Sequence, residues 1–88
     1  MLMVNQGKVD CSYIDKLLNL LENPFSTYYS DGYLNSEGMT ILSLLANATL
    51  HEWPWMKPLF RKVRIKRDYQ SIVNLARGIR ELCQGHAS

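Results

Sequence analysis

Residues 36–51 constrain the fold most, because a helix over this stretch would be apolar around nearly its whole circumference. Its polar positions form only a narrow stripe, made of Glu37, Thr40, Ser43, Asn47 and His51. Eight of the other eleven positions are Met, Ile, Leu or Ala. A helix of this kind is normally surrounded by other elements. We therefore predict a helix over 36–51, with Asn35 or Ser36 as its N-cap, at the centre of the fold.

An amphipathic helix is predicted over 12–22. Its apolar residues recur at i, i+3, i+4 and i+7, and they are Ile14, Leu17, Leu18 and Leu21. Ser12 followed by Asp15 resembles a capping box, with Asp in the usual place of Glu or Gln. Pro24 disfavours helical geometry in the residue before it, so this helix should end near Asn23.

The second half of the chain predicts two more helices after a break. Residues 53–58 contain two prolines four positions apart, which cannot both lie inside a regular helix. The apolar pattern of 59–66 fits either a helix or a strand, and we favour a short helix. Asp68 then caps a final helix that should end at Gly85.

Two shorter segments complete the prediction. Phe25, Tyr28 and Tyr29 would share one face of a short helical turn that Asp31 and Gly32 close. Residues 2–9 flank Asn5-Gln6-Gly7, a pattern compatible with a small hairpin or an irregular arm. We thus expect residues 1–88 to form a single all-α domain, a small bundle of three to four helices with room for a short N-terminal β element.

Positive charge is concentrated between residues 57 and 67. Six of these eleven residues are basic and none is acidic; the six are Lys57, Arg61, Lys62, Arg64, Lys66 and Arg67. Such a cluster attracts polyanions, and lysine and arginine bind nucleic acid by neutralising phosphates and releasing counterions. The first hypothesis is therefore a non-catalytic regulator or accessory factor that binds nucleic acid through these residues.

A second hypothesis uses the residues just before and within this cluster. Trp53, Trp55, Met56 and Phe60 have the composition of a protein-interface hot spot with a rim of positive charge. They would make the chain an adaptor, accessory subunit or inhibitor that docks on an acidic protein surface. In the ordinary structural alternative, the tryptophans close the core where the chain turns and the charges form a solvated face.

Other functions find little support in the sequence. No nucleophile, base and orienting group can be assembled from the residue spacing, and no glycine-rich phosphate loop or short-spaced metal-ligand pair is present, so we expect no enzyme, cofactor, metal site or small-molecule substrate. Cys11 and Cys83 are expected to be reduced core thiols. The longest apolar runs are too short for a membrane span, and a signal peptide is not indicated at Met1–Val4. These features favour the cytoplasm over a membrane, and they are compatible with either a monomer or a homodimer.

Overall fold

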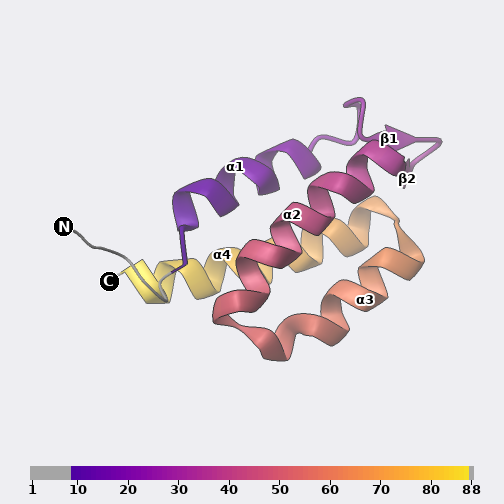
Figure 1. Ribbon diagram of the computed structural model, residues 1–88. Helices are drawn as coiled ribbons and strands as arrows, with labels where there is room; N and C mark the ends of the chain where they lie inside the picture. The colour runs from indigo at the N-terminus through magenta and orange to yellow at the C-terminus, as the bar shows by residue number, and fades with distance from the viewer. Residues whose placement is uncertain (1–8, 88) are drawn as a thin grey trace.

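Four α-helices, a short 3-10 helix and one β-hairpin are the elements of residues 9–87, the part of the chain that the computed structural model describes (Figure 1). In chain order the elements are α1 (Cys11–Leu21), β1 (Tyr29–Ser30), β2 (Tyr33–Leu34), α2 (Ser36–Glu52), the 3-10 helix η1 (Pro54–Met56), α3 (Lys57–Lys66) and α4 (Tyr69–Ala87). The predicted all-α bundle is confirmed. The segment 59–66 is helical, as favoured over the strand alternative.

The helices enclose one apolar core. α2 packs against α1 on one side and α3 on the other, and α4 packs against both α1 and α3 (Figure 1). The core side chains come from every helix, from η1 and from the hairpin, and they are Ile14, Leu17, Leu18, Leu21, Tyr29, Leu34, Leu42, Leu45, Ala46, Met56, Phe60, Val63, Ile72, Leu75, Ala76 and Ile79. The predicted central place of α2 is wrong, because α2 is one of four helices around the core, with α1 and α3 as its neighbours, and its outer face leaves Leu44 40% exposed.

The hairpin corrects the prediction for residues 25–32. In place of a helical turn, β1 and β2 pair antiparallel with Tyr29 opposite Leu34 and Ser30 opposite Tyr33. Asp31 and Gly32 have φ angles of 56° and 85°, and a type I′ hairpin turn, which matches strand twist, needs positive φ at both central positions. Asp-Gly supplies this conformation at low cost. The short β element thus lies at 29–34, while the element predicted around residues 2–9 falls, except for Val9, outside the described residues.

Asn35 joins the hairpin to α2. Its side-chain oxygen accepts a hydrogen bond from the Gly38 backbone N–H at 2.9 Å, which confirms Asn35 as the N-cap. Its amide nitrogen donates to the Thr27 carbonyl at 2.8 Å and to the Ser30 hydroxyl at 3.2 Å. One side chain therefore begins α2 and fixes the loop that precedes it.

Two of the predicted helix ends are wrong. Asp10, not Ser12, caps α1, and its carboxylate accepts from the Tyr13 N–H at 3.1 Å. α4 continues through Gly85 to Ala87, so Gly85 does not end it. At the other end of α4 the prediction is correct, because the Asp68 carboxylate accepts from the Ser71 N–H at 3.3 Å.

The expectation of two reduced thiols is also wrong, because Cys11 and Cys83 form a disulfide. α1 and α4 run in opposite directions, so the first residue of α1 lies beside the last turns of α4 (Figure 1). The bond joins residues 72 positions apart and closes that end of the bundle. A sequence separation this large gives no local signal for pairing.

Candidate nucleic-acid interface

α3 presents the basic cluster on the outside of the bundle. Phe60 and Val63 are its buried residues, and they anchor it to the core. Five of the six basic side chains of 57–67 are exposed, and Arg64 is half-buried. The Arg64 guanidinium donates a hydrogen bond to the Ser43 hydroxyl of α2 at 3.4 Å. Packing on one side of α3 thus leaves the charged side facing solvent.

The basic residues of α3 form two rows. Lys57, Arg61 and Arg64 line a groove of about 220 Å³ between α3 and α2. Lys62 and Lys66 line a second groove of about 320 Å³ between α3 and α4. The rows arise because residues three or four apart share a helix face, while 57 and 62 lie on different faces. The cluster therefore has two charged flanks.

None of these six charges is neutralised within residues 9–87. Both ion pairs of this part of the chain belong to Arg80. The nearest acid in sequence, Asp68, is occupied as the cap of α4: the hydrogen bond from the Ser71 hydroxyl is the main cause that lowers the pKa of Asp68, and Lys66 adds a smaller electrostatic effect. The positive charge of α3 is therefore available to an external anion.

The four aromatic and methionine residues predicted as a partner surface lie in different environments. Met56 and Phe60 are each 2% exposed and belong to the core. Trp53 is half-buried and packs against the core. Trp55, in η1, is 61% exposed. Only Trp55 among them presents a largely open surface, and it lies at the N-terminal end of α3.

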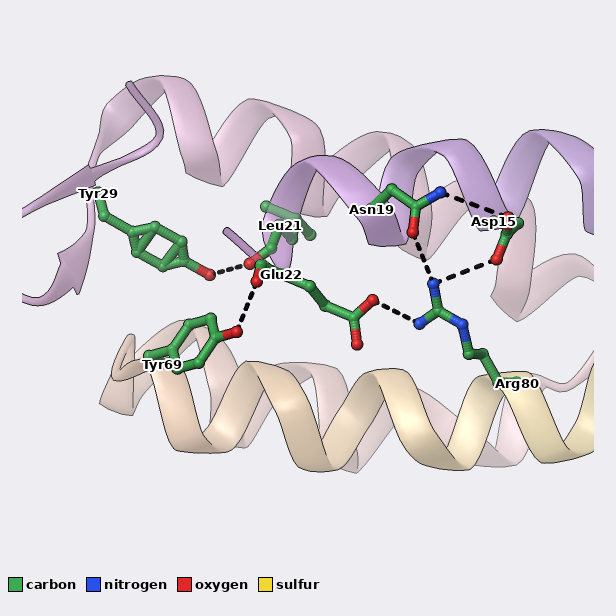
Figure 2. Close-up of polar contacts among 7 residues, drawn as sticks. All are labelled: Asp15, Asn19, Leu21, Glu22, Tyr29, Tyr69 and Arg80. Atoms are coloured by element: carbon green, nitrogen blue, oxygen red, sulfur yellow. Dashed lines mark hydrogen bonds and ion pairs between the residues drawn. The ribbon is translucent and has the colours of Figure 1, made fainter. Parts of the chain in front are cut away.

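A second polar cluster, which the sequence analysis missed, joins α1 to α4. The Arg80 guanidinium reaches Asp15 at 3.1 Å, Glu22 at 2.5 Å and the Asn19 side-chain oxygen at 2.9 Å (Figure 2). Asp15, Asn19 and Glu22 follow one another at spacings of four and three, so they share a helix face. That spacing was the available signal. The cluster is satisfied internally, which indicates a structural role.

Two tyrosine hydroxyls complete this α1–α4 contact. Tyr29 donates to the Leu21 carbonyl, and Tyr69 donates to the Glu22 carbonyl at 2.5 Å (Figure 2). These carbonyls lie at the C-terminal end of α1, where a helix lacks internal donors. Burial, with smaller effects of Tyr69 and Glu22, raises the pKa of Tyr29 well above its ordinary value. The tyrosines therefore act as caps for α1.

A pocket of about 340 Å³ lies beside the disulfide. Its lining includes Cys11, Cys83, Asp15 and Arg80. The two charged residues pair with each other, and the two sulfurs are bonded, so the pocket offers no free reactive group from these four. Across the described chain, no three histidine, cysteine, aspartate or glutamate residues converge as a metal site.

The helices of residues 9–87 also include none with the length and apolar character required to cross a membrane. Comparison of the chain with known proteins finds no matching protein family, no matching characterised protein and no matching solved structure.

Proposed function

We propose that the protein is a non-catalytic binder of nucleic acid that uses α3 as its contact surface. The observation that carries the proposal is a set of six basic side chains without an ion pair in the described residues, five on the externally placed α3 and the sixth, Arg67, at its C-cap. Unpaired Lys and Arg neutralise phosphates and release counterions, which provides affinity without sequence reading. The role is that of a small regulator or accessory factor.

Placement of the charges on a helix supports this proposal over a merely solvated face. Lys57 is at the start of α3, where the helix dipole disfavours a cation, and no acid lies in the first turn. Neighbouring α2 and α4 bring Ala46, Leu50, Ser71 and Asn74 to the two grooves, none of which carries a negative charge. A helix surface that served only solubility would be expected to carry both positive and negative side chains.

The test is an anisotropy titration with a labelled mixed-sequence duplex and a labelled single strand at low salt. Replacing Arg61, Lys62, Arg64 and Lys66 by Gln should greatly weaken binding to every sequence, while circular dichroism shows an unchanged helical fold. The matched control replaces two exposed cations elsewhere, Lys16→Gln and Arg77→Gln, and should retain binding. Absence of binding by the unaltered protein to both probes at low salt would refute the proposal.

Trp55 supports a second candidate function, docking on an acidic protein surface. It is 61% exposed beside Lys57, and an exposed tryptophan next to positive charge is typical of an interface anchor. On this alternative, Trp55→Ala should cost a protein partner on the order of 2 kcal/mol, with little dependence on salt. Binding that falls steeply with salt and survives Trp55→Ala would favour nucleic acid.

A cytoplasmic site of action belongs to the same proposal. The Cys11–Cys83 disulfide argues against this site of action, because disulfides persist chiefly in oxidising compartments.

A further inference from the structure

The outermost line of α3 lies between its two basic rows. At 100° per residue, Pro58 and Ile65 point to nearly the same direction, opposite the buried Phe60 and Val63. Both are exposed, and Ile65 is 76% exposed. Lys57 and Arg61 flank this apolar line on the side of α2, and Lys62 and Lys66 flank it on the side of α4. α3 therefore presents an apolar edge with cations on both sides.

This arrangement matches a double-stranded ligand. An α-helix with side chains is about 10–12 Å across, and the major groove of B-form DNA is about 12 Å wide with a phosphate backbone along each wall. A helix in that groove places its outer edge against the bases and its two flanks against the two backbones. A single strand has only one line of phosphates, which can engage only one row at a time.

The length of α3 and the neutral residues beside it are compatible with its entry into the major groove. α3 has ten residues, and at 1.5 Å per residue it is about 15 Å long, which spans roughly four base pairs. The residues that α2 and α4 contribute to the two grooves are neutral; they are Ala46 and Leu50 on α2 and Ser71, Asn74 and Leu75 on α4. A phosphate that approaches either row meets no negative charge from these residues.

We infer that the ligand is duplex DNA and that α3 enters its major groove, with Lys57 and Arg61 on one backbone, Lys62 and Lys66 on the other, and Ile65 against the base edges. The inference rests on the proposed function and adds to it the form of the nucleic acid and the orientation of the helix. Ile65 is placed to contact thymine methyl groups, the apolar feature of the major groove.

The first experiment compares three probes of one mixed sequence: the duplex, either isolated strand, and a duplex whose cytosines are replaced by glucosylated 5-hydroxymethylcytosine, whose sugar occupies the major groove. We expect the plain duplex to bind at least about tenfold more tightly than either strand or the glucosylated duplex. Equal affinity for strand and duplex, or no effect of glucosylation, would overturn the inference and leave the proposed function standing. Failure to bind any probe would remove both.

The second experiment compares two matched variants, each of which neutralises one row. Lys57→Gln with Arg61→Gln, and Lys62→Gln with Lys66→Gln, should each reduce the slope of log K against log salt on the duplex by about 2, since each contact contributes about 0.9. These four side chains are exposed, so the fold should persist. If the slope changes in one double variant and not in the other, only one row of α3 contacts the DNA phosphates, which would contradict the major-groove orientation.

Discussion

Gly38 lies where the first turn of α2 meets the loop before it. A Cβ at this position would stand 2.5 Å from the Tyr28 carbonyl oxygen and would overlap the Leu34 side chain. Because the carbonyl belongs to the backbone, Gly38→Ala should lower the free energy of unfolding by about 2 kcal/mol. Gly78 in α4 is the matched control: a Cβ there meets nothing within 4 Å, and Gly78→Ala should raise the same free energy by up to about 1 kcal/mol. Urea unfolding measures both, and effects of the same sign would contradict this account.

Thr49 has the one buried side-chain polar atom of the described residues that lacks a hydrogen-bond partner. The residue is 0% exposed in the last turn of α2. Thr49→Val keeps the shape and removes the unsatisfied hydroxyl, so it should raise the free energy of unfolding by about 1 kcal/mol. Thr40→Val, on the exposed face of the same helix, should change it little. A loss of stability in Thr49→Val would mean that the hydroxyl has a partner.

At the scale of elements, Arg80 holds α1 against α4 through Asp15, Asn19 and Glu22. These contacts are partly buried and charge-assisted, so Arg80→Met should lower the free energy of unfolding by about 1–2 kcal/mol. Arg77 lies on the exposed face of the same helix, and Arg77→Met should cost no more than about 0.5 kcal/mol. Thermal or urea unfolding compares the two variants. Equal losses of unfolding free energy would contradict a structural role for the Arg80 cluster.

The Tyr29 hydrogen bond at the C-terminal end of α1 should make the protein less stable at alkaline pH. The raised pKa of Tyr29 means that the folded state favours its neutral phenol, which donates to the Leu21 carbonyl. This stabilisation is complete below the ordinary tyrosine pKa of about 10 and is lost as pH rises towards the raised value. The free energy of unfolding should therefore fall above about pH 10 and fall less in Tyr29→Phe. Identical pH profiles for the two proteins would contradict the cap.

Helix positions were predictable because periodicity and capping act locally. Ile14 to Leu21 and the apolar residues of 36–51 each define a face within a few turns, and Asn35 and Asp68 cap helices through residues three positions away. The hairpin was missed although Asp31-Gly32 is a strong local signal, because the neighbouring tyrosines were assigned to a helical face. Leu34 also depends on a distant contact, since its N–H donates to the Arg67 carbonyl at 2.8 Å.

The whole molecule is closed by the Cys11–Cys83 disulfide. A crosslink over 72 residues restricts the unfolded chain strongly, and the chain-entropy estimate for that separation is about 4 kcal/mol. The oxidised protein should exceed the reduced protein in free energy of unfolding by up to about that amount. The control is the double variant Cys11→Ala with Cys83→Ala, whose unfolding should not respond to a reductant. Equal stability of oxidised and reduced wild-type protein would contradict the crosslink.

The candidate site was only partly predictable from the sequence. The cluster from Lys57 to Arg67 is visible as composition, but its division into two rows depends on which face of α3 the core buries. The buried residues Phe60 and Val63 define the face of α3 that packs on the core. Because Phe60 is buried, it cannot form part of a contact surface. The Arg80 cluster and the disulfide depend on α1 and α4 lying side by side, a relation between residues 58 or more positions apart that no local pattern encodes.

The most direct test of the central claim is the salt dependence of duplex binding by the unaltered protein. If the unpaired cations of α3 contact phosphates, log K should fall linearly with log salt at a slope of about −4 to −5. The variant with Gln at positions 61, 62, 64 and 66 should show a much shallower slope at those salt concentrations where it still binds. A slope near zero for the unaltered protein, or one equal in the two proteins, would contradict a phosphate-binding role for α3.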